Sequence, residues 1–236
     1  MLCLPVLAQS QSLLAGKNTL KWNLSSLALN NYHFTYERSI MKHVSLSLSY
    51  RTMAKGPIPY ADKFRDQLNS NDINFDNFQI GNTAITPELR FYFSLKRMKG
   101  FYIAPYARFA SFDLSVPVKY DNGTPGAPVK EALMTGKITS TSGGILLGYQ
   151  FNIARKLILD FQIIGGHYGT SKGTLDFPSP TPLSPSEQQV LRDHLNSITA
   201  DPFKFKSTVT ANGAVVASDG PWAGIRGLNL GLGIRF

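Results

Sequence analysis

The chain has 236 residues, of which 43% are hydrophobic and only 17% are charged, and its formal net charge is +9. Globular chains carry about 25% charged residues, so this composition indicates a surface poor in charge. No run of about 18 apolar residues exists, which excludes a transmembrane helix. The basic excess lies in short turns and on single faces of alternating segments, where it could not follow a nucleic acid, so no nucleic-acid partner is expected.

Residues 1–8 resemble the end of a secretory signal peptide. Val6-Leu7-Ala8 is a small-residue cleavage site of the A-x-A type. The segment has no basic start and is too short for a full leader, so we expect the true start codon to lie upstream. Cleavage after Ala8 would remove Cys3, the one cysteine, which suits an oxidising compartment. The mature barrel domain is expected over 17–236.

Much of the chain alternates between apolar and polar residues, which is typical of β-strands with two different faces. Between Val44 and Tyr50, for example, every second residue is apolar and the others are serine. Most of these segments reach the roughly 9–11 residues that a strand needs to cross a bilayer at a tilt. The segments predicted as strands are 19–27, 31–38, 43–53, 84–95, 100–114, 137–152, 156–170 and 222–236.

The connections between these segments follow a pattern typical of outer-membrane barrels. Such barrels have an even number of strands, short periplasmic turns and long external loops. Placing the C-terminus in the periplasm puts every long connection outside, and the N-terminus then also lies in the periplasm. The long connections are 54–83, 115–136 and 171–221, and the short ones are 28–30, 39–42, 96–99 and 153–155.

The long connections contain signals of local structure. Ser184-Pro185-Ser186-Glu187 is a capping box with proline at the first helical position, and apolar residues follow at helical spacing. This predicts a short amphipathic helix over about 185–198, lying across the outer mouth. A second, weaker helix is predicted over 60–69. A hairpin is predicted over 203–218, turning at Asn212-Gly213.

The last ten residues, 227–236, form the clearest alternating segment. One face is apolar and the other is small or polar, which suits lipid on one side and a lumen on the other. The terminal Phe236, together with Ile234 and Leu232, resembles the signal that the barrel-assembly machinery recognises in Gram-negative outer membranes. That machinery is therefore an expected partner during insertion.

Charged side chains are predicted on the inward faces of the strands. An eight-stranded barrel is just wide enough for its own side chains to fill it, and unpaired buried charge is costly. We therefore expect these charges to pair and to plug the lumen. Because bases outnumber acids, a narrow anion-preferring pore is the alternative. The predicted lumen charge network is Lys21, Glu37, Arg51, Glu88, Arg90, Arg108, Asp160 and Arg235.

No motif in the sequence specifies a metal site, a cofactor or a known catalytic centre. The four histidines lack metal-ligand spacing, and no cofactor is expected. If the alternation of Leu159, Phe161 and Ile163 continues, His167 faces lipid near the outer interface. Some barrel enzymes that trim lipid A place a histidine and a serine there, so His167 and Ser171 are candidate base and nucleophile. Otherwise His167 belongs to an interfacial aromatic girdle.

Several segments together resemble an uncharacterised family of small outer-membrane barrels, a domain-of-unknown-function family of Gram-negative gut and oral anaerobes. The overall plan is also similar to OmpA-type and OmpX-type barrels. The resemblance implies residence in the outer membrane, and the position of some relatives near fimbrial genes implies a surface-structure role. It implies no catalytic residue. The segments that carry it are 29–38, 86–93, 100–108, 165–169 and 220–226.

The sequence thus predicts an all-β fold, an eight-stranded antiparallel up-and-down transmembrane β-barrel whose long external loops carry one or two short helices. We expect a structural or surface-interaction role, with 54–83 and 171–221 as the recognition surface. Membrane lipids, lipopolysaccharide and phospholipid, are the expected surroundings, and a surface or fimbrial partner is expected. The alternatives are an outer-leaflet lipid-modifying enzyme and the narrow pore.

Overall fold

The chain folds as one closed antiparallel sheet, described by a computed structural model over residues 16–57, 78–120, 130–197 and 202–236. Nine strands lie in the described residues. They are β1 (Asn18–Asn23), β2 (Asn31–Ser39), β3 (Val44–Pro57), β4 (Gln79–Tyr92), β5 (Gly100–Tyr120), β6 (Lys130–Asn152), β7 (Leu157–Pro178), β8 (Lys204–Thr210) and β9 (Gly213–Arg235).

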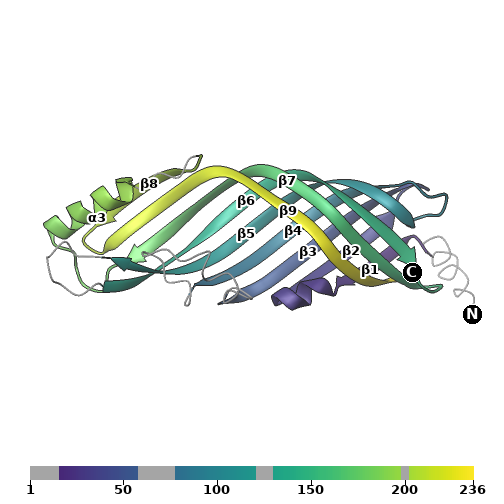
Figure 1. Cartoon of the computed structure of the whole chain (residues 1–236), viewed down its shortest axis with the longest axis horizontal. Helices are drawn as coiled ribbons and strands as arrows, with labels where there is room; N and C mark the ends of the chain where they lie inside the picture. Colours follow the sequence, from purple (N-terminus) through teal and green to yellow (C-terminus); the bar gives the residue numbers. More distant parts are fainter. Residues whose placement is uncertain (1–15, 58–77, 121–129, 198–201) are drawn as a thin grey trace, which may run out of the picture.

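Eight of these strands form a ring. Each of β1 to β7 pairs with the next strand along the chain, β7 pairs with β9, and β9 closes the ring by pairing with β1. Every pairing is antiparallel, so the predicted eight-stranded up-and-down barrel is confirmed. The short strand β8 lies outside the ring and pairs in the described residues only with the far half of β9. The strands are strongly tilted, and the C-terminus lies at the end of the barrel opposite α3 (Pro185–Ser197) (Figure 1).

The polarity of the barrel is the reverse of that of a water-soluble barrel. In β3 the side chains of Ser45, Ser47 and Ser49 are buried, whereas Leu46 and Leu48 are about half exposed, at 51% and 52%. The same alternation runs along the whole of β2. An apolar outside and a polar inside are typical of a barrel that stands in lipid.

Two predicted strands end earlier than expected: the strand predicted over 84–95 ends at Tyr92, and the strand predicted over 19–27 is also shorter. The first strand ends at Asn23 and not at residue 27, because a 3-10 helix, η1 (Ser25–Leu29), follows it. Asn23 causes the change, since its Oδ1 accepts hydrogen bonds from Ser26 N (3.1 Å) and Ser25 Oγ (2.8 Å) in place of strand pairing.

The far ends of the strands are longer than predicted. Much of the connection predicted over 115–136 is sheet, as are the two ends of 171–221. Beyond the apolar part of the barrel both faces of a strand can be polar, so alternation no longer marks it. Figure 1 shows these extensions reaching past the ends of β1 and β2 towards α3.

The predicted helix and hairpin in 171–221 are confirmed. The helix α3 begins at Pro185 behind a reciprocal capping box, in which Ser184 N donates to Glu187 (2.8 Å) and Glu187 N donates to Ser184 Oγ (3.3 Å). Strands β8 and β9 form the hairpin, and Gly213 after its turn has φ +127°. The helix predicted over 60–69 lies outside the described residues. No helix that the structure describes combines the length and apolar character needed to span a membrane.

Candidate functional site

A network of ion pairs crosses the lumen near the end that holds the C-terminus. Lys21 on β1 pairs with Glu37 on β2 and, at 2.6 Å, with Asp160 on β7. Arg90 on β4 reaches the same two carboxylates, at 2.7 Å from Asp160 and 3.4 Å from Glu37, and lies 2.7 Å from Glu88. The side chains of these five residues are at most 3% exposed. We call this group the lumen plug.

Neutral side chains complete the lumen plug. Tyr92 donates its hydroxyl proton to Glu37 (2.7 Å), and Tyr102 donates to Asp160 (2.9 Å). The Arg90 guanidinium lies 4.6 Å from the centre of the Tyr102 ring. The void beside Lys21 and Asp160 measures only about 10 Å³, about the space of one water. Side chains from opposite walls therefore meet and leave no wide passage at this level.

The structure brings together five of the eight residues predicted as the lumen charge network. The other three lie elsewhere on the inner wall. Arg235 donates to the backbone carbonyls of Arg97 (3.2 Å) and Met98 (3.0 Å) at the β4–β5 turn. Arg51 and Arg108 lie farther along their strands, away from the lumen plug, and Arg108 Nη1 donates to Thr86 Oγ1 (3.3 Å).

Sequence reasoning missed Arg226, whose Nη2 lies 3.0 Å from Glu88. The alternation of 227–236 places even-numbered residues outside, yet Arg226 is buried in the lumen. The exception arises where Leu228 adopts a left-handed backbone (φ +51°). Ile163, opposite it on β7, is the extra residue of a bulge in the pairing of β7 with β6, and the faces exchange there. Ile225 and Leu228, both exposed and three residues apart, are the sequence signal for this change.

The same bulge overturns the expected position of His167. Instead of facing lipid, His167 points into the lumen, where its Nδ1 lies 3.1 Å from the hydroxyl of Tyr106. Ser171 is on the same face but four residues farther along β7, about 13 Å away at the usual rise of a strand. Its hydroxyl donates to the carbonyl of Gly220 (3.3 Å). The two side chains therefore do not form a base–nucleophile pair on the lipid face.

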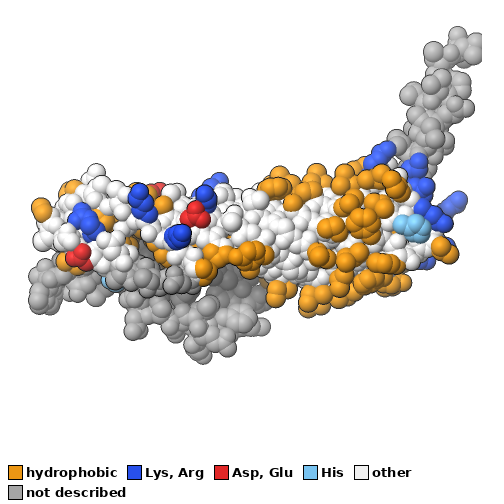
Figure 2. All heavy atoms as spheres, turned by 90° about the horizontal axis from the view of Figure 1, so that it is seen from above, with side chains coloured by type: hydrophobic (Ala, Val, Ile, Leu, Met, Phe, Trp, Pro, Cys, Tyr) orange, Lys and Arg blue, Asp and Glu red, His pale blue; other side chains and the backbone are white. Residues whose placement is uncertain are grey.

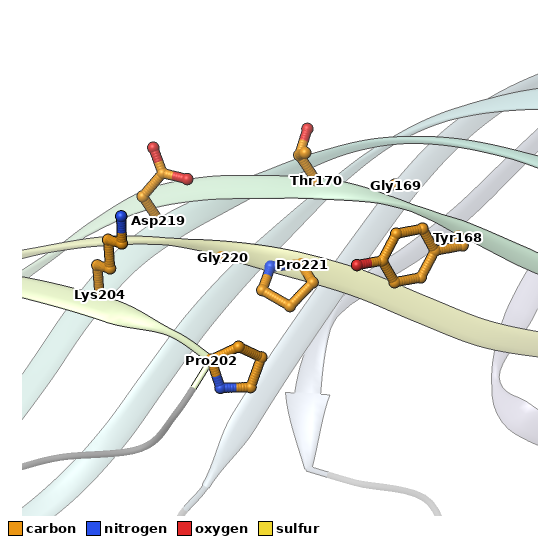
Figure 3. A pocket seen from close by; sticks show the side chains of 8 residues that line it. All are labelled: Tyr168, Gly169, Thr170, Pro202, Lys204, Asp219, Gly220 and Pro221. Atoms are coloured by element: carbon orange, nitrogen blue, oxygen red, sulfur yellow. The ribbon is translucent and has the colours of Figure 1, made fainter.

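A pocket lies on the outer wall, just beyond the exposed apolar side chains. Its volume is about 430 Å³, and Figure 3 shows the phenol of Tyr168 pointing towards Pro221 at one end, with Lys204 and Asp219 at the other. A neighbouring hollow of about 300 Å³ shares Lys204 and Asp219. Asp219 also pairs with Lys172 at 3.3 Å. The residues that line the pocket are Tyr168, Gly169, Thr170, Pro202, Lys204, Asp219, Gly220 and Pro221.

The described residues contain no group of three or more His, Cys, Asp or Glu side chains that could hold a metal ion. The contacts that the lumen plug makes are ion pairs and hydrogen bonds. The outer pocket offers contact with a phenol, an ammonium and a carboxylate.

Three solved structures are similar to the chain. They are the N-terminal β-barrel domain of Pseudomonas aeruginosa OprF (11% identity, 94% of this chain and 98% of that one, TM-score 0.34), a major outer membrane protein from Thermus thermophilus (12%, 93% and 98%, 0.38) and Neisserial surface protein A (11%, 93% and 94%, 0.27). Among curated proteins nothing matches the chain. A family model, by contrast, matches residues 1–179, well over half of the sequence. The chain therefore belongs to the family described as "Protein of unknown function (DUF3575)".

Proposed function

We propose that this protein is an outer-membrane β-barrel that is closed to solutes and that carries a binding surface on its outer end. The observation that carries the proposal is the lumen plug, in which Lys21 and Arg90 are each paired with carboxylates from other strands across the barrel. Conduction would require breaking several buried ion pairs at once. Because each unpaired charge would then be left in a poorly solvated lumen, the closed state is strongly favoured.

The outside of the barrel supports a position in lipid. Large apolar side chains are exposed on every strand of the ring, and Figure 2 shows them gathered on one half of the molecule, with Lys and Arg beside them at the end of the barrel. Phospholipid and lipopolysaccharide are thus the proposed neighbours. Representative members of this apolar belt are Leu20, Phe34, Leu48, Leu89, Phe109, Ile145, Ile164 and Ile225.

The orientation that we propose has both termini in the periplasm. The connections of 40–43, 93–99 and 153–156 are short and lie at the end of the barrel that holds the C-terminus (Figure 1). The opposite end carries α3, β8 and the outer pocket, which supports an outward-facing role for this part. Surface binding, by a partner at α3 or at the pocket of Tyr168 and Lys204, is the activity that this arrangement favours.

Two measurements test the proposal. First, the purified full chain in a planar bilayer should give no discrete conductance steps above the lipid background. Steps that change in size in a Lys21→Met variant would contradict a closed lumen.

Second, single cysteines should report the orientation in a Cys3→Ser background. Ser186→Cys on α3 should react with a membrane-impermeant maleimide in intact cells. Lys96→Cys, in the β4–β5 turn, should react only after the outer membrane is permeabilised. Both positions are exposed, so accessibility to water does not differ between them. The reverse pattern would contradict the proposed orientation.

No observation favours the lipid-modifying alternative at His167, because that side chain contacts Tyr106 inside the barrel. An enzyme acting on outer-leaflet lipid would need its base on the lipid face.

A further inference from the structure

Three arginines line the lumen beyond the lumen plug, towards the end of the barrel that holds α3. They are Arg51 on β3, Arg108 on β5 and Arg226 on β9. Arg226 stacks over Tyr106, with its Cζ 4.6 Å from the ring centre, and Tyr106 is two residues before Arg108 on the same face of β5. Arg226 is close enough to act electrostatically on both Arg51 and Arg108. We call these residues the arginine layer.

The arginine layer is short of negative charge. In the described part of the chain its one ion pair joins Arg226 to Glu88, and Glu88 is shared with Arg90 of the lumen plug. Arg51 and Arg108 have no ion pair among those residues. Two guanidinium nitrogens, Arg51 Nε and Arg226 Nη1, are buried without a hydrogen-bond partner. Buried donors of this kind are costly unless something accepts from them.

Apart from Glu88, the described side chains around the arginine layer carry no carboxylate, and they are small or polar. On one side of Arg51 the paired residue is His33 of β2. Going round the wall from Arg51, the paired residues are Ala84, Ala110 and Ser140. Arg108 pairs with Ser142, which has a buried hydroxyl without a partner. His167 and Tyr106 lie beside them. These residues offer hydroxyl and ring N–H donors but no further carboxylate.

We propose that the arginine layer binds an oxyanion, a phosphate or carboxylate group, between Arg51, Arg108 and Arg226. Guanidinium groups bind such anions with two parallel hydrogen bonds, and several of them around one site are matched by an anion with several oxygens. The bound anion would accept from the two orphaned nitrogens and relieve the repulsion between the arginines. The lumen plug below it holds two cations and three carboxylates, and Arg226 balances the third carboxylate through Glu88. Arg51 and Arg108 are therefore the positive charges in excess.

The test uses the purified full chain in detergent micelles, in a buffer of low ionic strength without phosphate. Inorganic phosphate and acetate are titrated separately by isothermal calorimetry, and thermal unfolding is followed by circular dichroism with and without each anion. Wild-type protein should bind at least one of the two saturably at one site and unfold at a higher temperature when it is present. Whichever of the two anions binds more tightly shows whether the site prefers a phosphate or a carboxylate group.

The variant Arg51→Gln, Arg108→Gln should bind about tenfold or more weakly, because it lacks two charge-assisted partners. Without anion it should unfold at the same or a higher temperature than wild type, since the repulsion is reduced. If the two arginines served only to stabilise the fold, the variant would instead unfold at a lower temperature than wild type. The matched control is Arg155→Gln, in the exposed β6–β7 turn, which should change neither result.

The proposal is overturned if wild-type protein shows no saturable binding, or if the double variant binds as well as wild type. It is also overturned if the Arg155→Gln control weakens binding equally, since binding would then reflect net charge. Should the double variant fail to fold, Arg51→Lys and Arg108→Lys, which keep the charge but lose the two-pronged geometry, are measured in the same way. None of these outcomes depends on whether the barrel conducts.

Discussion

The two halves of the barrel wall differ in the polarity of their outer faces although the same strands build both. In the half near the C-terminus, β7 turns Asp160 into the lumen and its apolar neighbours outwards. In the far half, β7 turns Phe177 inwards, where Leu191 and Leu195 of α3 pack against it, and Lys172 outwards. The outer face of β7 is thus apolar near Asp160 and polar near Lys172. The difference locates the outer edge of the apolar belt between Ile164 and Lys172.

The largest expected effect comes from removing the centre of the charged half. Arg90→Ala leaves Glu37, Glu88 and Asp160 buried without this partner. Breaking a buried pair in this way destabilises a protein by about 3–5 kcal/mol. We therefore expect the variant to unfold, or to lose the difference in gel mobility that a folded barrel shows between unheated and heated samples (heat-modifiability). Circular dichroism melts measure the loss. Arg155→Ala is the control, and equal stability of the two variants would contradict a structural lumen plug.

The second prediction compares the outer surfaces of the two halves. Leu48→Arg places a charge within the apolar belt, and Thr174→Arg places the same charge on the exposed far wall. On a lipid face an arginine costs about 2–4 kcal/mol near the bilayer centre, and little in water. Unfolding by urea in lipid vesicles should therefore be easier for Leu48→Arg alone. Equal behaviour would place the bilayer boundary elsewhere.

The third prediction asks whether the far half is needed for the near half to fold. Pro178 and Gly213 are paired across β7 and β9, so residues 179–212 can be replaced by a two-residue turn. The barrel should still fold, because the lumen plug keeps all of its contacts. Heat-modifiability and the melting temperature should stay close to wild type, whereas binding at the outer surface should be lost. Failure to fold would show that α3 and its small apolar core stabilise the whole barrel.

How far the sequence predicts the molecule depends on which half is considered. Within the apolar belt, lipid and lumen force a strict alternation, so strands such as 31–38 and 43–53 could be placed within a few residues. Beyond the apolar belt the wall has no lipid face, so the sequence of the extended parts of β5 and β6 does not alternate strictly between apolar and polar residues. The capping box at Ser184 could still be recognised in the sequence, because it depends on local hydrogen bonds alone.

The candidate site was predictable only where alternation was unbroken. Lys21, Glu37 and Arg90 lie on regular strands, and their inward position followed from parity. Arg226 and His167 lie past Ile163, which is the extra residue of β7 in its pairing with β6, and past Leu228, which lies opposite it on β9. The two faces exchange there. The bulge is a register shift between β6 and β7, so it depends on how two strands pair, and the spacing of Ile225 and Leu228 marks only where the faces exchange on β9.

The smallest expected effect concerns His167, which lies near the change of polarity. His167→Ala removes a hydrogen bond to Tyr106 and should destabilise the barrel by about 1 kcal/mol. Because the imidazole faces the lumen, the mass spectrum of lipid A from cells that express this variant should match that of cells expressing wild type. The control is Ser171→Ala, which removes a hydroxyl from the same face. A lipid A mass shift that wild type produces and His167→Ala abolishes would mean that lipid reaches the inner wall, and the closed barrel would have to open sideways near the bulge.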